Sequence, residues 1–278
     1  NAVYYNVKKA AFADPLGGVE DIRDRRIDTV VSPEEVFRVD GLRLLRLCRF
    51  SAELGFAPSE GAVEGARAHC RNIRDISAER VFDEMKKMLS ADIKYPFSDP
   101  RGHYFAFKLC HRIGVLDLVM PELTAGDGMP QRADFHDYDV LEHSFRTLLY
   151  ADKSVRLAAL LHDVGKPYAM KRYGAYKTHN AEGERIARDI LTRLKAPKSV
   201  VEEVCALTYL HMADLDLKMK EGKVRLFMAE HENLLSKLFL LKQADYSACK
   251  DDLSPAPTVV KWKNILEKMR AKGAPLTK

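Results

Sequence analysis

The chain has 278 residues, enough for two or three modest domains with apolar cores of their own. Hydrophobic residues make up 46% and charged residues 31%, which excludes a disordered or fibrous chain. Forty-five basic and 40 acidic side chains leave a net charge of +5, which permits a nucleic-acid partner without requiring one.

Cysteine usage and hydropathy indicate a cytoplasmic protein. Five cysteines are scattered singly with no CxxC pair, which predicts buried thiols rather than a disulfide framework or a zinc–thiolate site. Lys237 interrupts the best apolar run, 234–241, so we expect neither a membrane span nor a signal peptide. The chain opens at Asn1 in a strand-like stretch, and we expect it to be a fragment of a longer protein.

The predicted elements are mainly helical. Residues 1–18 predict a short strand followed by a turn, and the first thirty or so residues look β-like or irregular. A helix is predicted to start at the N-cap Ser32 with Pro33 in its first turn, and a leucine-rich helix to end at Gly55. The 3.6-residue period predicts further helices within 77–91, 102–119, 137–152, 155–163, 181–195, 199–212, 232–248 and 258–272.

Two breaks divide this helical pattern. The stretch 121–137, which contains glycine and proline, is the best internal boundary, and 251–257 precedes a basic terminal helix. The sequence has no repeat of 20–50 residues and no low-complexity tract. We therefore expect a mainly α protein made of two helical units and a short β-like N-terminal segment.

A histidine and an aspartate follow an apolar run in LAALLHDVGK, residues 157–166. Taken alone, His162-Asp163 has two interpretations. It is either part of a metal site or a polar helix end, where an imidazole interacts favourably with the helix dipole. Only other residues with the same chemistry can decide between them.

Four further residues share that chemistry. His143 lies 19 residues earlier in an amphipathic helix, Asp245 lies in a later one, and His179 and His211 fall between them. A lone histidine on a helix is usually a hydrogen-bonded core or surface residue, so the combination is more informative than any member. Imidazoles and carboxylates without thiolates suit Mn, Fe, Mg, Ni or Co better than structural zinc, and helical bundles build such sites from facing helices.

A second informative stretch is the arginine-rich helix within 37–56. Arg43, Arg46 and Arg49 recur every three residues and share one side of it, and Asp40 precedes Arg43 by three. The simpler interpretation, which composition alone favours, is an exposed ion pair worth a few tenths of a kcal/mol. The alternative is that an Asp acceptor and a planar Arg donor together recognise a nucleobase or phosphate.

The histidines and aspartates resemble the H…HD…D motif of the HD superfamily of metal-dependent phosphohydrolases. In order and helical context the matching residues are His143, His162, Asp163 and Asp245. The resemblance implies that these four bind a divalent metal ion, and that His179 and His211 are the extra histidines of two-metal members. It also implies that Asp163 and Lys166 are catalytic, with Lys166 positioning a phosphate.

Upstream motifs resemble class II tRNA nucleotidyltransferases, the family of CCA-adding enzymes and bacterial poly(A) polymerases. Three stretches match successive motifs in the right order, at 14–30, 38–56 and 76–89. GVLDLVMPEL at 114–123 and FHDYDVLEH at 135–143 resemble the body and the HD insertion of bacterial members. The resemblance implies a helical neck and body bundle followed by an all-α HD domain, with a short remnant of the head.

The same resemblance implies roles for individual residues. Asp40 and Arg43 belong to the template that pairs with incoming CTP or ATP, and Arg46 and Arg49 neighbour nucleotide or RNA phosphates. The residues that match the flexible linker are Asp14, Gly17, Gly18, Asp21 and Arg25. Those that match a neck motif bracing the nucleotide site are Glu79, Arg80 and Glu84.

Two departures from the family pattern bear on activity. Val39 stands where the template usually has glutamate, which removes one hydrogen-bonding group. The family's catalytic head, with its Gly-Ser phosphate loop and Asp-x-Asp site for Mg²⁺, would precede Asn1. We therefore expect this chain not to transfer nucleotides by itself.

The leading interpretation is the C-terminal part of an enzyme that adds nucleotides to RNA 3′ ends, with an HD domain that trims 2′,3′-cyclic or terminal phosphates. Expected partners are the tRNA 3′ end, ATP and CTP, and a homodimer is favoured over a monomer. The alternatives are a stand-alone HD nucleotide phosphohydrolase and a non-catalytic helical RNA-binding scaffold. The expected divisions are 1–30 (end of head and linker), 31–128 (neck and body), 129–250 (HD domain) and 251–278 (basic C-terminal helix).

Overall fold

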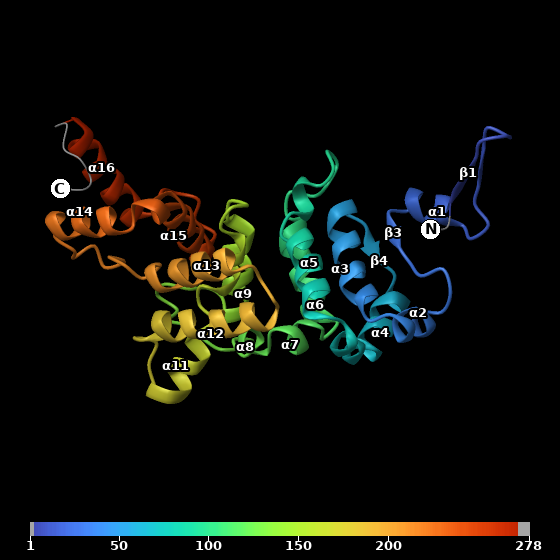
Figure 1. Ribbon diagram of the computed structural model, residues 1–278, viewed down its shortest axis with the longest axis horizontal. Coiled ribbons are helices and arrows are strands. Elements are labelled where there is room, and N and C mark those ends of the chain that lie inside the picture. The colour runs from blue at the N-terminus through green and yellow to red at the C-terminus, as the bar shows by residue number, and fades with distance from the viewer. Residues whose placement is uncertain (1–2, 272–278) are drawn as a thin grey trace. The chain divides into compact units, whose positions relative to one another are not determined.

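The computed structural model describes residues 3–271, and the chain divides into two compact units, Asn1–Pro121 and Glu122–Lys278 (Figure 1). Almost all regular structure in the described residues is helical, so the mainly α fold is confirmed. Residues 1–2 and 272–278, the ends of the predicted N-terminal strand and basic C-terminal segment, lie outside the described residues. No helix described within 3–271 combines the length and apolar character needed to cross a membrane.

The first unit is a helical bundle preceded by a β-hairpin. Its elements are β1 (Tyr4–Asn6), β2 (Ala11–Ala13), α1 (Gly18–Arg23), β3 (Arg26–Ile27), α2 (Pro33–Val39), α3 (Leu42–Leu54), β4 (Ala57–Pro58), α4 (Glu60–Ala68), the 3₁₀ helix η1 (Cys70–Asp75), α5 (Ala78–Met88), η2 (Ala91–Ile93), α6 (Gly102–Arg112) and α7 (Leu116–Val119). β1 pairs antiparallel with β2, with Tyr5 opposite Phe12. β3 pairs in parallel with β4, with Arg26 opposite Ala57.

Helix α3 forms the centre of this unit because its apolar side packs against both α5 and α6 (Figure 1). Leu44 and Leu45 are buried almost completely, which follows from the predicted leucine pattern. The predicted ends are confirmed. Ser32 accepts a hydrogen bond from the Glu35 backbone amide at 3.3 Å, and Gly55 closes α3 with a left-handed φ of 64°.

Two expectations for the first unit are wrong. The segment expected to be β-like or irregular contains helix α1, because the Asp14 carboxylate accepts the backbone amides of Gly18 and Val19 at 2.8 Å each and caps the helix. The single helix predicted within 102–119 is broken into α6 and α7. Gly114 adopts a φ of +77° between them, a left-handed conformation that ends α6.

The second unit is also helical. Its elements are α9 (Val140–Tyr150), α10 (Arg156–Leu161), α11 (Lys166–Tyr173), α12 (His179–Arg193), α13 (Lys198–Leu210), α14 (Glu221–Glu230), η3 (Glu232–Leu234), α15 (Leu235–Lys250) and α16 (Pro257–Ala271), with the short α8 (Pro121–Thr124) at the unit boundary. α9 packs against α10 and α15, and α13 packs against α10 and α12. The sequence analysis predicted no helix at α11 or α14. Helix α16, which was expected to stand apart from the HD domain, belongs to the same compact unit as α9–α15.

An ion-pair network inside the first unit gives a stability prediction. The nearly buried Arg49 lies 2.7 Å from Glu53 and 2.6 Å from Glu84, and both carboxylates are themselves buried. Arg49→Met would leave two buried carboxylates without this cation, so we expect a loss of about 3–5 kcal/mol in the free energy of unfolding. Urea unfolding followed by circular dichroism measures it. Arg46→Met, on the exposed side of α3, is the control and should change stability by less than about 0.5 kcal/mol. Equal stability of the two variants would contradict the prediction.

Candidate functional site

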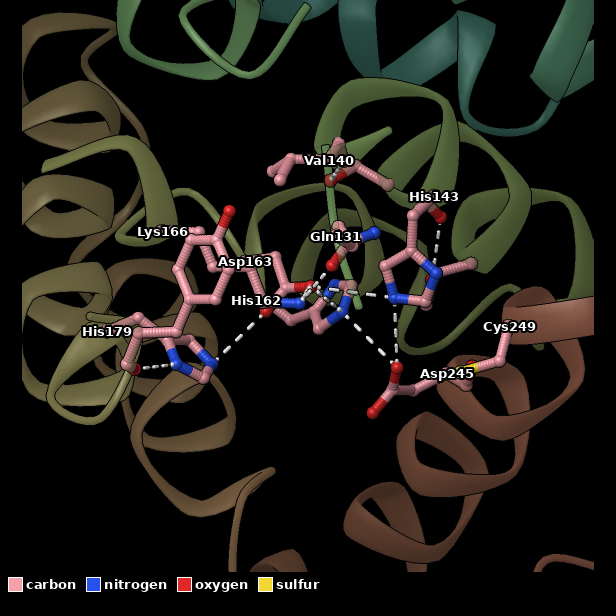
Figure 2. Close-up of polar contacts among 12 residues, drawn as sticks. Gln131, Val140, His143, His162, Asp163, Lys166, His179, Asp245 and Cys249 are labelled. Atoms are coloured by element: carbon pink, nitrogen blue, oxygen red, sulfur yellow. Dashed lines mark hydrogen bonds and ion pairs between the residues drawn. The ribbon is translucent and has the colours of Figure 1, made fainter. Parts of the chain in front are cut away.

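The six histidines and aspartates singled out in the sequence converge in the second unit, and Figure 2 labels all of them except His211. They come from five places in the chain: His143 on α9, His162 and Asp163 just after α10, His179 at the start of α12, His211 at the end of α13, and Asp245 on α15. Five of the six are almost completely buried, and Asp245 is the most accessible. Residues more than a hundred positions apart therefore share one buried polar cluster.

Each carboxylate lies near more than one imidazole. The Asp245 carboxylate lies 3.0 Å from His143 Nε2 and 3.5 Å from His162 Nε2. The Asp163 carboxylate lies 3.1 Å from His162 Nε2, 3.2 Å from His179 Nε2, 3.5 Å from His143 Nε2 and 3.6 Å from His211 Nε2. His143 and His162 thus lie between the two carboxylates, and every imidazole presents Nε2 to the centre of the cluster.

Backbone carbonyls orient three of these rings. His162 Nδ1 lies 2.8 Å from the Ala159 carbonyl, and His179 Nδ1 and His211 Nδ1 each lie 2.6 Å from the carbonyl three residues earlier. With Nδ1 as the donor in each contact, the neutral form of each ring has its lone pair on Nε2. This is the arrangement by which proteins fix the tautomer and direction of a metal-binding histidine.

Burial and charge oppose each other at the cluster. Burial would raise the pKa of Asp163, but His162 and Lys166 hold it well below its usual range. Burial would lower the pKa of His162, yet Asp163 and Asp245 outweigh it and raise that pKa to about 10. His211 behaves in the opposite way, because burial lowers its pKa to about 4. Two ionised carboxylates in a buried site are stable only if positive charge lies close to them.

The donor set fits a divalent metal ion. His162 Nε2 is buried and has no hydrogen-bond partner among the described residues, and a bound cation would satisfy it. Three triplets bring their donor atoms within 4.8 Å of one another, and two of them draw only on the six residues: His143, His162 and Asp245, and then His162, Asp163 and His211. The third triplet joins His143 to His136 and Cys249. The two triplets of the six residues offer nitrogen and carboxylate donors without a thiolate, which match Mn, Fe, Co, Ni or Mg better than a structural zinc site.

The local sequence explains why His162 and Asp163 lie here. α10 ends at Leu161 and His162 is its C-cap, so this residue is both the polar helix end and a member of the cluster. The chain then turns into α11 at Gly165. A Cβ at Gly165 would collide with the His179 carbonyl and with the Gly183 backbone, so only glycine lets α12 approach. That approach brings His179 to Asp163.

Lys166 also reaches the cluster. Its ammonium lies 2.6 Å from Asp163 Oδ2 and donates to Gln131 Oε1 at 2.6 Å. Gln131 is itself held by its amide, which donates to the backbone carbonyls of Tyr138 and Asp139. The segment before α9 therefore fixes the position of the lysine that follows the HD pair.

Sequence reasoning missed three neighbours of the cluster: Gln131, His136 and Cys249. The His136 ring lies edge-on to His143 with centroids 4.8 Å apart, and burial, together with His143, lowers the pKa of His136 to about 4. His136 stands three residues before Asp139, the N-cap of the His143 helix, a signal that sequence reasoning could have used. Gln131 and Cys249 carry no comparable signal, because only the tertiary fold brings them to the cluster.

A carboxylate at the end of α15 ties together the two helices that carry His143 and Asp245. Asp251 accepts hydrogen bonds from Tyr138 and Tyr150 at 2.6 and 2.7 Å, and from Arg146 at 2.6 Å. α9 and α15 are thereby joined one to two turns from the cluster. This connection stabilises the short distance between His143 and Asp245.

The predicted nucleotide-facing residues lie in the first unit, on α3 and α5 and at their N-terminal ends. Asp40 Oδ2 lies 4.0 Å from Arg80, and Asp40 Oδ1 accepts the Leu42 amide at 3.0 Å. Arg43 donates to the Val36 carbonyl at 3.2 Å. Among the described residues, Asp40 thus pairs with Arg80 on α5. The simpler interpretation of the sequence was an ion pair between Asp40 and Arg43, which the structure does not show.

The other members of this set differ in exposure. Arg46, Glu79 and Arg80 are exposed and available to a ligand. Arg49 is buried between Glu53 and Glu84, so its guanidinium is already bound within the protein. Val39, at the position that departs from the family template, is 65% exposed.

Comparison with protein families gives two matches. Residues 140–248 match the HD domain family, and residues 55–96 match a family described as "Probable RNA and SrmB- binding site of polymerase A". The first match runs from the start of α9 to near the end of α15 and includes all six histidines and aspartates of the cluster. The second covers α4, α5 and η2 in the first unit.

Similar proteins of known function cover both units. The chain is 34% identical over 85% of its length to the A-adding tRNA nucleotidyltransferase of Deinococcus radiodurans, and 32% identical over 83% to the CC-adding tRNA nucleotidyltransferase of Thermus thermophilus. It covers 55% and 54% of these proteins, so it spans little more than half their length. A crystal structure of the Bacillus stearothermophilus CCA-adding enzyme in complex with CTP shares the fold, with a TM-score of 0.58 and 23% identity over 97% of this chain and 57% of that one.

The close approach at Gly165 gives a prediction for the second unit. Gly165→Ala would push α11 away from α12, so we expect a loss of about 1–3 kcal/mol in the free energy of unfolding, measured by thermal or urea unfolding of metal-free protein. Gly222→Ala is the matched control, because a Cβ at Gly222 meets nothing within 4 Å. That variant should be neutral or slightly stabilising. The prediction is wrong if both alanine variants unfold together with the unsubstituted chain.

Proposed function

We propose that the chain belongs to the tRNA nucleotidyltransferase family and is part of an enzyme that adds nucleotides to RNA 3′ ends. The observation that carries this proposal is similarity to A-adding and CC-adding enzymes that runs through both units. In this proposal the first unit selects ATP or CTP and holds the tRNA 3′ end. Asp40, Arg43 and Arg80 would face the base, and the exposed Arg46 would face phosphate.

A second activity is proposed for the HD domain, metal-dependent hydrolysis of 2′,3′-cyclic or terminal phosphates on RNA. The histidine–aspartate cluster favours it. A divalent ion there would polarise a phosphoryl oxygen and lower the pKa of a water molecule. Mn, Fe, Co, Ni and Mg all suit the donors, and two triplets that share His162 are compatible with two ions.

The residues around that site have separable tasks. Asp163 and Asp245 supply negative charge, and His143, His162, His179 and His211 supply Nε2 donors in fixed directions. Lys166, held by Gln131 beside Asp163, would bind a phosphate oxygen and orient the substrate. Buried surroundings exclude bulk water and strengthen these contacts.

The alternatives are less well supported. A stand-alone nucleotide phosphohydrolase would not account for similarity to nucleotidyltransferases across the first unit. A non-catalytic scaffold would not need six convergent histidine and aspartate side chains, buried at a cost in stability. We also propose that the protein is cytoplasmic, in keeping with its five free cysteines, and that it forms a homodimer, which light scattering would test.

Metal binding and hydrolysis can be tested together. We expect protein purified without chelator to carry about one or two transition-metal ions per chain by elemental analysis, and to hydrolyse 2′,3′-cyclic AMP when Mn²⁺ or Ni²⁺ is added. His162→Ala and Asp163→Asn should each lower metal content and reduce hydrolysis at least about a hundredfold. Asp252→Asn, an exposed aspartate after α15, is the control. Absence of both metal and hydrolysis in the unsubstituted protein would refute the proposed HD activity.

RNA binding is tested separately. Phosphate contacts release counterions, so the affinity of the 278-residue chain for tRNA should fall about linearly on a plot of log affinity against log salt. Fluorescence anisotropy between 50 and 300 mM salt measures the slope. Affinity that is absent, or that does not respond to salt, would contradict both the transferase proposal and the scaffold alternative.

A further inference from the structure

A further group of metal-ligand side chains lies beside the histidine–aspartate cluster. His136, His143 and Cys249 each bring one donor atom within 4.8 Å of the other two. His136 lies in the segment before α9, His143 on α9 and Cys249 near the end of α15. His136 and Cys249 both fall outside residues 140–248, the span that matches the HD domain family, and neither belongs to the H…HD…D motif. This triplet therefore has to be interpreted from its own chemistry.

Both histidines of the triplet have a buried ring nitrogen, Nδ1, without a hydrogen-bond partner among the described residues. In His143 the other nitrogen is already engaged, because Nε2 lies 3.0 Å from Asp245 Oδ1 and 3.5 Å from Asp163 Oδ2. When Nε2 donates to Asp245, the neutral ring carries its lone pair on Nδ1. Buried polar atoms are nearly always paired, so two such atoms in rings with centroids 4.8 Å apart indicate a binding place for a cation.

The thiol of Cys249 completes the group. Its Sγ donates to the Asp245 carbonyl, 3.3 Å away and one turn earlier on α15, and Figure 2 shows the two residues together on that helix. A thiol is a weak hydrogen-bond donor, so little is lost when the sulfur binds a metal ion instead. Cys249 is half-buried, unlike the fully buried Cys48 and Cys110, which gives an ion access to the sulfur.

The spacing of the donors suits zinc. Zn²⁺ binds imidazole nitrogen at about 2.0–2.1 Å and thiolate sulfur at about 2.3 Å in a tetrahedron, which sets its ligand atoms about 3.5 Å apart. Donors that lie within 4.8 Å of one another therefore need movements of only about 1 Å to bind one ion. His136 can supply this movement, since it lies in an irregular segment rather than in a helix.

The thiol also distinguishes this triplet from the histidine–aspartate cluster. The cluster offers only nitrogen and carboxylate oxygen, which suit Mn, Fe, Co, Ni or Mg. A soft sulfur ligand beside two imidazoles selects a thiophilic ion such as Zn²⁺. The two neighbouring sets of side chains thus prefer different metals.

A simpler interpretation is that the three side chains only pack against one another. The rings of His136 and His143 meet edge-on, a geometry that ordinary aromatic packing also produces. Packing does not explain the two buried Nδ1 atoms, because an unpaired buried polar atom costs free energy. A shared metal ion would satisfy both atoms at once.

We propose that His136, His143 and Cys249 bind a thiophilic divalent ion, Zn²⁺, at a site separate from the histidine–aspartate cluster. On binding, the thiol releases its proton to solvent and the thiolate sulfur forms the bond to zinc. His143 belongs to both sites, with Nε2 toward Asp245 and Nδ1 toward the zinc ion. The inference goes beyond the proposed nucleotide addition and phosphate hydrolysis and depends on neither.

The test uses Co²⁺ as the probe, because cobalt occupies tetrahedral zinc sites and a thiolate ligand gives it a charge-transfer absorption band in the near ultraviolet. The full 278-residue chain, freed of metal and kept reduced, is titrated with Co²⁺. We expect the band to appear, and to disappear when Zn²⁺ displaces the cobalt. Cys249→Ser should abolish the band. His136→Gln should weaken Co²⁺ binding at least about tenfold, since the loss of a residue that merely supports a metal ligand already costs that much.

Two further variants are controls. Cys70→Ser removes a thiol that is also half-buried but lies in the first unit, so the band should remain. Asp163→Asn alters the histidine–aspartate cluster and should also keep the band, because Asp163 is not part of the triplet. Circular dichroism checks that each variant is folded.

The outcomes separate this inference from the proposed function. A band that is absent from the unsubstituted chain, or unchanged in folded Cys249→Ser protein, overturns the inference and leaves the proposed activities standing. Loss of the band in Asp163→Asn also overturns it, because the thiolate would then bind an ion of the cluster. A cysteine-dependent band in a chain that neither hydrolyses phosphates nor binds RNA supports the inference although the proposed function fails.

Discussion

The buried carboxylate of Asp163 governs the organisation of the second unit. A charge removed from water is stable only when nearby groups compensate it, and Asp163 is met by His162, His179, His211 and Lys166 from three successive parts of the chain. Each of those contacts requires a helix end or a helix start to point inward. The packing of α10, α11, α12 and α13 is therefore arranged around one ionised group, and the same arrangement creates a donor set for a divalent cation.

The first unit handles buried charge in a different way. Arg49 is satisfied by Glu53 and Glu84, so the pair of helices α3 and α5 is joined by a network that needs no ligand. Its neighbours Arg46 and Arg80 remain exposed. Arg46 and Arg49, three residues apart on one helix, therefore differ: Arg49 is bound within the protein and Arg46 faces outward.

How far prediction succeeded depended on the kind of signal. Ser32 and Gly55 were placed correctly because capping is a local property of a few residues. Gly114 broke a helix that periodicity treated as continuous, since a hydrophobic period is insensitive to one left-handed residue. Gln131 was missed because it acts from an irregular segment, where neither period nor motif marks its side chain.

The sequence by itself determined the helical class, the identity of the histidine and aspartate set, and the family resemblance, because these depend on residue type and spacing along the chain. Tertiary structure alone decided which atoms meet. The approach of α12 to Gly165, the contact of Arg49 with Glu84 and the anchoring of Tyr95 through Ser98 all join residues distant in sequence. Such contacts follow from how whole helices pack, and no pattern read along a single segment contains that information.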